Sequence, residues 1–552
     1  MSDLIPHSRT GGRILVDALV LNGVDTVYCV PGESYLPVLD ALHDVAGIRT
    51  YVARHEGAAA NMADAYGKLT GRPGICFVTR GPGATHASIG VHTARQDSTP
   101  MILFVGQVER GFMEREAFQE IDYRLMFGGV AKWVTEVQDL ARIPEVLARA
   151  FSVAMSGRPG PVVIALPEDI LFGSGVVDDA HPSRATQAAP TAEDLAVLQT
   201  LLGQARQPLM IVGGSGWDEP SCAQLMAFAR KQALPVAASF RRQDLFDNRA
   251  ENYVGQIGLG ISPQLAERMK AADLLIAVGT RLGEVSSGGY ALVQSPVPTQ
   301  TLVHIHADAN ELGRVYQARL AINSGMRQFA QALATLPGVD VNRSAWTQAA
   351  RAAYLAHSTP QPSHPEHRGV DLAHVVAHLN DVLPDDAVIS NGAGNYTVWV
   401  HRFYRYRRQA TEMAPTSGAM GYGLPAAVAA KLKHPHRQVV CFAGDGCFMM
   451  YPQELATAVQ YGAAIIVIVV NNGMLGTIRM HQEREYPGRI SSTSLRNPDF
   501  VALAHAFGAF AEVVERSEDF PAAFARAQAA GIPALLELRT DPKQITPTLR
   551  LE

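Results

Sequence analysis

Short runs of β-branched and aliphatic residues alternate along the chain with alanine-rich stretches whose apolar positions recur every three or four residues. The runs predict strands buried on both faces, and the alanine-rich stretches predict helices that cover a sheet. One such helix is predicted over Gly57–Thr70, with an apolar stripe of Ala58, Met62, Ala65 and Leu69. Strands are predicted at 51–54, 74–79, 208–214, 272–280, 301–307, 438–444 and 463–470.

Two stretches interrupt this alternation. Ser174–Asp194 and His357–Arg368 are rich in Pro, Ser and small polar residues, which is typical of interdomain linkers. Repeated strand and helix patterns on either side of them indicate parallel sheets wrapped by helices. The sequence therefore predicts an α/β fold of three doubly wound parallel-sheet domains, over residues 1–180, 190–350 and 365–552.

Composition narrows the class of protein. With 552 residues, 47% of them hydrophobic and 18% charged, the chain is expected to be globular. Its net charge of -5 offers no basic surplus for a phosphate backbone, so no nucleic acid partner is expected. Five cysteines are too few for a disulfide framework, which favours the cytoplasm. The aliphatic run Ala463–Val470 is too short to span a bilayer, and residues 1–12 lack the apolar core of a secretion signal.

The strongest chemical signal lies in the last third of the chain. A predicted strand ends in Gly444-Asp445-Gly446, and the next predicted strand ends in Asn471-Asn472, with a helical segment between them. Both polar turns then fall at the carboxyl ends of parallel strands, where such sheets bind ligands. If the two strands are neighbours, the side chains of Asp445 and Asn472 can converge on one small cation.

One carboxylate with amide and backbone oxygens suits magnesium, which takes phosphate oxygens to complete its octahedron. The flanking glycines let backbone amides approach a diphosphate at the start of a helix. Taken alone, Gly-Asp-Gly is more often a turn that caps the next helix. Its combination with Asn-Asn at strand–helix–strand spacing favours the metal and diphosphate interpretation.

On these motifs the sequence resembles the thiamine diphosphate enzymes, and among them the acetolactate synthase group, along nearly its whole length. The resemblance implies a pyrimidine-binding, a middle and a diphosphate-binding domain. It also implies that Gly444, Asp445 and Gly446 bind the diphosphate, and that Asp445, Asn472 and the backbone carbonyl of Met474 hold Mg²⁺.

The same resemblance supplies further site residues. The activating glutamate of the family stands in an Arg-His-Glu-Gly-Ala context, which matches Glu56, although a glutamate at a helix start is also an ordinary dipole partner. Such a carboxylate bonds the cofactor's pyrimidine nitrogen and so activates the cofactor. The other residues that the resemblance assigns to the cofactor or the reacting carbons are Pro31, Gly32, Phe118, Gln119, Gly418 and Met420.

Three positions depart from the acetolactate synthase pattern and are candidates for the substrate pocket. His481 stands where that group carries Trp, and it either bonds an acceptor or faces solvent. Ser34 follows Pro31-Gly32-Glu33, where the group reads Pro-Gly-Gly. Arg80 replaces a serine, and it pairs either with a substrate carboxylate or with Glu33.

The middle domain resembles the FAD-binding domain of that group at Ile211–Gly216 and Gly279–Arg281 but lacks its Gly-Met-His-Gly element, so FAD stays open. The resemblance implies decarboxylation of a 2-oxo acid such as pyruvate and ligation to a second carbonyl. It also implies a homodimer or homotetramer whose subunits share each active site. The alternatives are a simple 2-oxo acid decarboxylase or carbon–carbon lyase, and a non-catalytic nucleotide-binding regulatory protein. The sequence does not decide whether a regulatory subunit exists.

Overall fold

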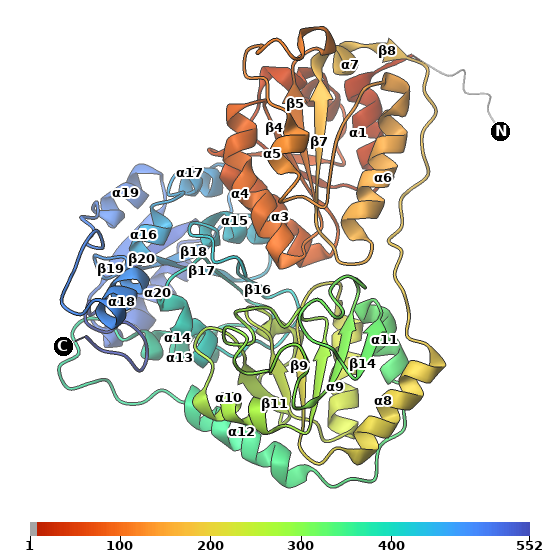
Figure 1. Cartoon of the computed structure of the whole chain (residues 1–552). Coiled ribbons are helices and arrows are strands. Elements are labelled where there is room, and N and C mark those ends of the chain that lie inside the picture. Colours follow the sequence, from red (N-terminus) through yellow and green to blue (C-terminus); the bar gives the residue numbers. More distant parts are fainter. Residues whose placement is uncertain (1–7, 552) are drawn as a thin grey trace. The chain divides into compact units, whose positions relative to one another are not determined.

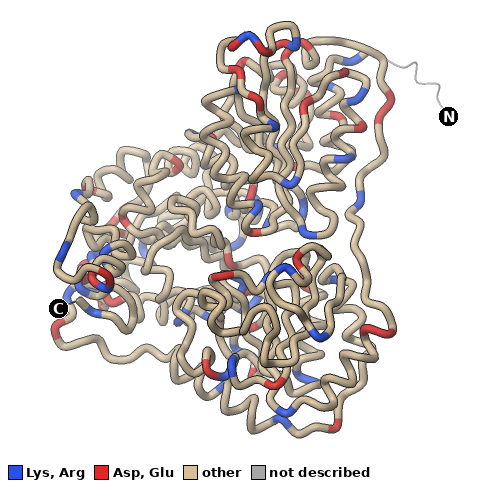
Figure 2. Tube along the Cα trace, viewed as in Figure 1, with Lys and Arg blue, Asp and Glu red and all other residues tan. Residues whose placement is uncertain are grey.

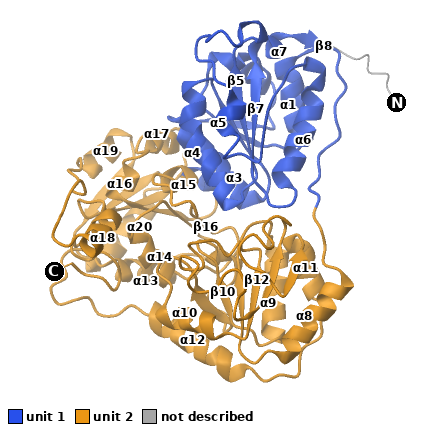
Figure 3. Cartoon of the chain, viewed as in Figure 1, with its two compact units in different colours: residues 1–186, 428–433 blue, residues 187–427, 434–552 orange. Residues whose placement is uncertain are grey.

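The computed structural model describes residues 8–551, which form two compact units (Figures 1 and 3). One unit holds the described residues up to Thr186 together with Val428–Lys433, and the other holds Gln187–Ala427 and the residues from His434 onward. Residues 1–7, which contribute to the expectation of no secretion signal, lie outside the described residues. Among residues 8–551, no helix has the length and apolar character needed to cross a bilayer.

The first unit is built on a six-stranded parallel sheet with strand order β3-β2-β4-β5-β7-β6. Its strands are β2 (Thr26–Cys29), β3 (Arg49–Val52), β4 (Gly74–Val78), β5 (Met101–Gln107), β6 (Trp133–Glu136) and β7 (Pro161–Pro167). Its helices are α1 (Gly11–Leu21), α2 (Leu36–His43), α3 (Glu56–Thr70), α4 (Pro82–Asp97), α5 (Tyr123–Phe127), α6 (Ile143–Met155) and α7 (Glu168–Phe172). A short antiparallel pair joins β1 (Arg9–Thr10) to β8 (Ser174–Gly175).

Helix α3 confirms the predicted amphipathic stripe, because Ala58, Met62, Ala65 and Leu69 are all buried. The helix starts one residue earlier than its predicted start at Gly57, because His55 caps it by accepting a hydrogen bond from the Gly57 N–H. Gly71 ends the helix in the left-handed conformation, with φ of 66°.

The second unit contains two further six-stranded sheets. The first has strand order β11-β10-β9-β12-β13-β14, with all neighbours parallel. Its strands are β9 (Pro208–Val212), β10 (Val236–Ala238), β11 (Tyr253–Gln256), β12 (Leu274–Val278), β13 (Thr301–His306) and β14 (Leu320–Asn323). Its helices are α8 (Ala192–Gln204), α9 (Glu219–Lys231), α10 (Pro263–Ala271), α11 (Met326–Leu333) and α12 (Ser344–Ser358).

The other sheet of this unit has strand order β16-β15-β17-β18-β20-β19, again with parallel neighbours. Its strands are β15 (Val388–Asn391), β16 (Glu412–Met413), β17 (Val439–Gly444), β18 (Ile466–Asn471), β19 (Phe510–Val514) and β20 (Ala534–Arg539). The helices of this part of the chain are α13 (Leu372–Val382), α14 (Tyr396–Phe403), α15 (Gly423–Lys433), α16 (Asp445–Phe448), α17 (Glu454–Gln460), α18 (Gly476–Glu485), α19 (Phe500–Ala506) and α20 (Phe520–Ala529). The second half of α15, Val428–Lys433, groups with the first unit.

The three parallel sheets confirm the predicted fold class. The central strands of each sheet are buried along their length, as expected of sheets covered by helices on both faces. The predicted linker 357–368 begins inside α12, because that helix continues to Ser358. The three domain boundaries themselves remain a prediction.

Charged side chains of both signs are mixed along the trace (Figure 2). The five cysteines are buried and form no disulfide.

Candidate active site

Strands β17 and β18 are direct neighbours in the second unit, with Gly444 paired to Val470. The Gly-Asp-Gly turn and the Asn-Asn turn therefore end adjacent strands at the same edge of the sheet, which is the condition on which the predicted convergence of Asp445 and Asn472 depended. A cavity of about 290 Å³ opens at this edge. Its lining includes seven of the predicted cofactor residues, namely Gly418, Met420, Gly444, Asp445, Gly446, Asn472 and Met474.

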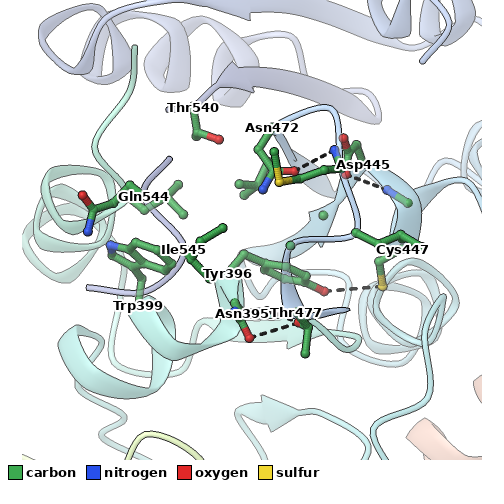
Figure 4. Close-up of a pocket in the computed structure, with 18 of the residues that line it drawn as sticks. Asn395, Tyr396, Trp399, Asp445, Cys447, Asn472, Thr477, Thr540, Gln544 and Ile545 are labelled. Atoms are coloured by element: carbon green, nitrogen blue, oxygen red, sulfur yellow. Dashed lines mark hydrogen bonds between the residues drawn. The ribbon is translucent and has the colours of Figure 1, made fainter. Parts of the chain in front are cut away.

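Asp445 is a buried acidic group of this cavity (Figure 4), with a side chain held in place by three N–H donors. Its Oδ1 accepts from the Gly446 N–H at 2.8 Å, and its Oδ2 accepts from the Gly473 N–H at 2.9 Å and from Asn497 Nδ2 at 2.8 Å. Burial raises the pKa of Asp445, while the three donors oppose that shift by favouring the carboxylate. A cation at this carboxylate would offset the cost of its burial.

Asn472 and Met474 lie in the turn that follows β18. The side-chain oxygen of Asn472 accepts from the Met474 N–H at 3.1 Å, and the Met474 carbonyl accepts from the Gly476 N–H at 3.0 Å. Each of these oxygens has a second lone pair that can bind a cation. The donor set of one carboxylate, one amide oxygen and one carbonyl therefore fits Mg²⁺ with phosphate oxygens and water.

Sequence reasoning missed Asn497, which joins the two turns. Its Nδ2 donates to Asp445 at 2.8 Å and to Asn471 Oδ1 at 3.0 Å. Asn471 in turn donates to Glu537 on β20 at 2.8 Å. Asn497 lies in an irregular segment with no motif of its own, so only the folded chain reveals its position.

The glycine at position 446 lets side chains from other segments pack against the Asp445 turn. A Cβ at this position would lie 2.9 Å from Leu475 Cδ2 and 3.8 Å from Met420 Cε. Met420 thus reaches the Gly-Asp-Gly turn from another segment of the chain, and it also packs against the core of this domain. Gly418 is exposed at the cavity, with φ of 67°.

The far side of the cavity is formed by the chain after β20, another feature that sequence reasoning missed. Thr540, Gln544 and Ile545 line it together with Trp399 of α14 (Figure 4). Thr477 and Asn395 are joined there by hydrogen bonds of 3.0 Å. Six separate segments of the C-terminal part of the chain therefore border this cavity.

Glu56 begins α3 in the first unit, beside β4 and α4. Its Oε2 is 2.8 Å from His86 Nδ1, and its side chain is 15% exposed. The ligand atoms of His55, Glu56 and His86 lie within 4.8 Å of one another. The two imidazole rings are stacked, with centroids 4.5 Å apart and planes at 28°. In stacked imidazoles the in-plane lone pairs run roughly parallel and do not converge on one point, as ligands of a metal ion must. We therefore interpret the trio as a hydrogen-bonded stack instead of a metal centre.

Phe118 and Gln119 lie in the loop before α5. Phe118 is 74% exposed, whereas the side-chain oxygen of Gln119 is buried without a hydrogen-bond partner among residues 8–551. Gln119 adopts a φ of 66° and packs closely on Gly81, where an added Cβ would lie 2.8 Å from the Gln119 carbonyl. The buried, unsatisfied oxygen of Gln119 fits a residue that meets a ligand.

The Pro31-Gly32 turn leads into a short 3₁₀ helix over Glu33–Tyr35. Ser34 is fully buried, and its hydroxyl lies 2.9 Å from that of Thr79. An added Cβ at Gly32 would lie 2.5 Å from Thr79 Cβ, so this turn packs directly on the end of β4.

Arg80 forms ion pairs with Glu33, at 3.4 Å, and with Glu168 at the start of α7. The pairing with Glu33 is one of the two alternatives from the sequence, and Glu168 is a partner that sequence reasoning missed. His481 is exposed on α18, with Nδ1 2.9 Å from Arg484 on the same helix.

In the middle domain the two loops that resemble a nucleotide site follow the adjacent strands β9 and β12. They pack on each other so closely that an added Cβ at Gly214 would lie 2.0 Å from the Gly279 carbonyl. Thr280 donates to Ser239 at 3.1 Å beneath them.

Comparison with known proteins agrees with this architecture. Family models of the thiamine pyrophosphate enzymes match the N-terminal TPP binding domain at residues 9–126, the central domain at 195–333 and the C-terminal TPP binding domain at 392–538. The chain belongs to the thiamine pyrophosphate enzyme family. The family and the fold inferred from the sequence are thereby confirmed.

Individual relatives narrow the similarity to one group. The chain is 33% identical to the acetolactate synthase large subunit of Parasynechococcus marenigrum, over 91% of this chain and 83% of the relative. It is 32% identical to the acetolactate synthase large subunit of Corynebacterium glutamicum, over 95% and 85%. It is 31% identical to the acetolactate synthase isozyme 2 large subunit of Escherichia coli, over 96% and 95%.

Proposed function

We propose that this protein is a thiamine diphosphate-dependent enzyme that decarboxylates a 2-oxo acid such as pyruvate and joins the remaining carbon unit to a second carbonyl. The observation that carries this proposal is the cavity at the ends of β17 and β18, whose buried carboxylate, Asp445, lies beside glycine turns in a chain related throughout to acetolactate synthases. Magnesium is the cation that this oxygen donor set suits best.

In this proposal Asp445, Asn472 and the Met474 carbonyl hold the cation, and the turn of Gly444 and Gly446 borders the diphosphate. Gly418 offers its carbonyl to the aminopyrimidine, and Met420 supports the bend between the two rings. When bound, the cofactor supplies an acidic carbon nucleophile that can store the electron pair released with carbon dioxide.

Glu56 has the task of exchanging a proton with the pyrimidine nitrogen. Its low exposure keeps water from competing for that hydrogen bond. Pro31 and Gly32 border the cofactor, while Phe118 and Gln119 border the reacting carbons. Arg80, Ser34 and His481 remain candidates for the substrate pocket, although Arg80 and Ser34 already have protein partners.

The products of pyruvate decide between the proposed reaction and its closest alternative. The holoenzyme, loaded with Mg²⁺ and thiamine diphosphate, is incubated with pyruvate alone and the products are identified by mass. Acetolactate supports ligation, whereas acetaldehyde alone indicates a simple decarboxylase or lyase. A panel of other 2-oxo acids and aldehydes then defines donor and acceptor.

A third outcome concerns the non-catalytic alternative. If no 2-oxo acid is consumed and the thiazolium carbon of the bound cofactor exchanges its proton no faster than in solution, the protein is not a thiamine diphosphate enzyme of this kind. Glu56→Gln is the matched control, because it keeps the shape of the side chain and removes the carboxylate. We expect it to retain cofactor and to lose about 10²–10⁴-fold in turnover.

We further propose a homodimer or homotetramer in which one chain supplies Glu56 and its partner supplies Asp445 to the same site. Mixing the inactive variants Glu56→Gln and Asp445→Ala tests this arrangement. After subunit exchange, a mixed dimer has one intact site of two, so roughly a quarter of the wild-type activity should return. If both residues of one site came from a single chain, no mixture of these variants would regain activity.

Three finer points belong to the proposal, namely FAD, the location in the cell and a regulatory subunit. FAD in the middle domain is tested by the flavin absorption spectrum of the purified protein, and a cytoplasmic location agrees with five buried cysteines that form no disulfide. A regulatory subunit would be sought by co-purification from the source cell.

A further inference from the structure

The two carboxylate oxygens of Glu56 have different surroundings. Oε2 is 2.8 Å from His86 Nδ1. Oε1 has no hydrogen-bond partner among residues 8–551, and it faces Gly83, where an added Cβ would lie 3.7 Å from it. One oxygen of Glu56 is thus engaged by the protein, and the other remains open beside a glycine.

His86 is held in a defined orientation by its neighbours. It lies on α4, and its ring stacks on that of His55 with a centroid distance of 4.5 Å. His55 is itself fixed, because its Nδ1 accepts the Gly57 N–H at 3.0 Å as the cap of α3. An ionised Glu56 carboxylate can only accept a hydrogen bond. The Nδ1 atom of His86, which faces it, must therefore carry a proton.

The close packing of α3 on α4 sets the distance between Glu56 and His86. An added Cβ at Gly90 of α4 would lie 2.4 Å from Ala60 Cβ of α3, so the two helices meet almost backbone to backbone. Glu56 lies one helical turn before Ala60, and His86 lies one turn before Gly90. The hydrogen bond therefore joins two helices that have little freedom to move apart.

The other titratable groups around Glu56 stay neutral near physiological pH. Burial raises the pKa of the Cys76 thiol on β4 and of the Tyr35 hydroxyl, and Glu56 raises both further. Burial, together with the adjacent His86, lowers the pKa of His55. His86 is therefore the group that donates to the Glu56 carboxylate from a neighbouring element.

We propose that His86 is a positioning residue for Glu56: its Nδ1–H stabilises the carboxylate and fixes the rotamer that leaves Oε1 open for a nitrogen base of the ligand. This inference rests on the proposed function of Glu56 toward the cofactor pyrimidine. Without the donor, the carboxylate holds a proton more tightly and also samples other rotamers.

Two substitutions separate the hydrogen bond from the ring stack. His86→Phe keeps a flat ring over His55 but removes the donor, whereas His86→Asn keeps an N–H donor and removes the ring. In cofactor-free protein with ¹³C-labelled Glu carboxyls, the Glu56 signal is assigned by its loss in Glu56→Gln. We expect the Glu56 pKa to rise by about one unit in His86→Phe and to return toward wild type in His86→Asn.

The loaded enzyme gives the second measurement. The acidic limb of kcat/KM should move upward by about one pH unit in His86→Phe, and proton exchange at the thiazolium carbon should slow by about tenfold at a pH below that limb. His92→Phe, on the same helix, is the matched control and should leave both unchanged. A wild-type Glu56 pKa in His86→Phe, or equal shifts in His86→Phe and His86→Asn, would overturn the inference.

The Glu56→Gln variant separates this inference from the proposed function. If Glu56→Gln leaves exchange at the thiazolium carbon unchanged, the role of Glu56 itself is wrong, and the inference about His86 falls with it. If Glu56→Gln abolishes exchange at the thiazolium carbon but Glu56 titrates identically in wild type and His86→Phe, only the positioning role of His86 is refuted.

Discussion

At the scale of single residues, Asp445 shows how a buried carboxylate is prepared for a cation. Three N–H donors fix its orientation while burial raises its pKa, so the side chain is rigid and its charge is poorly solvated. Such a group gains more from a bound cation than an exposed carboxylate does, because water no longer screens the attraction. Asn497 contributes one of the three donors and also bonds Asn471, so it ties the Asp445 turn to the turn after β18.

This arrangement predicts a graded effect of substitution. Asp445→Ala removes a proposed metal ligand and should abolish Mg²⁺-dependent binding of thiamine diphosphate in isothermal titration calorimetry. Asn497→Ala leaves Asp445 in place but removes its orienting donor, together with the bond to Asn471, and should weaken that binding about 10–100-fold. Unchanged affinity in Asp445→Ala would refute the ligand assignment, and equal losses in both variants would show that Asn497 does more than orient Asp445.

At the scale of elements, the packing of α3 on α4 is the contact on which the geometry of Glu56 depends. Gly90 permits it, because an added Cβ would lie 2.4 Å from Ala60 Cβ and 2.7 Å from the Ala60 carbonyl carbon. Backbone atoms cannot move aside as a flexible side chain can, so a larger residue must separate the helices.

Gly90→Ala should therefore lower the free energy of unfolding by about 1–3 kcal/mol, measured by denaturant titration, and should reduce turnover together with stability. The matched control is Gly203→Ala in α8, where nothing lies within 4 Å of an added Cβ. That change should raise stability by up to about 1 kcal/mol, because alanine favours the helix. Equal effects at the two positions would contradict the importance of the α3–α4 contact.

At the scale of the whole chain, a buried acidic pair connects the last two sheets inside the second unit. Glu412 of β16 accepts the Gln243 N–H at 2.6 Å, and Asp244 accepts the Thr411 N–H at 3.3 Å. Both carboxyl groups are almost fully buried. Burial, together with the nearby Asp244, raises the pKa of Glu412 to about 8.

The raised pKa predicts a pH dependence of stability. Between the ordinary value of 4.5 and about 8, the folded chain keeps a proton on Glu412 that the unfolded chain has lost. The contribution of Glu412 to the free energy of unfolding is therefore most favourable below pH 4.5, and the protein loses stability as the pH rises from there toward 8. Glu412→Gln, which is neutral at every pH, should remove this loss and stabilise the protein by about 1–3 kcal/mol at pH 8 in thermal unfolding scans.

Glu518→Gln is the control for this experiment, because Glu518 is 66% exposed. It should leave the pH dependence as in the wild type. If the stability of Glu412→Gln depends on pH in the same way as that of the wild type, the carboxyl of Glu412 is not the group that titrates.

Local pattern was sufficient for the fold class, for seven of the eighteen strands in the three parallel sheets and for the principal motifs. Runs such as 438–444 and 463–470 predict buried strands because both faces of a parallel sheet need apolar side chains, and the segment between them is long enough for only one crossover. The positions of Asp445 and Asn472 at one edge then follow from the topology. The assignment of Glu56 to the site depended on the family resemblance, because a glutamate at the start of a helix is also common as a partner of the helix dipole.

The sequence by itself determined the α/β class, the strand ends that carry the chemistry and the family. The tertiary structure decided what surrounds those groups: Asn497 beside Asp445, Glu168 beside Arg80, and His86 beside Glu56. Neither periodicity nor a motif in the sequence indicates that these segments meet. Contacts between segments that are distant in the sequence depend on how sheets and helices pack, and this packing leaves no trace in local spacing. A pattern can place a carboxylate at a strand end, but its proton affinity depends on neighbours that only the folded chain brings together.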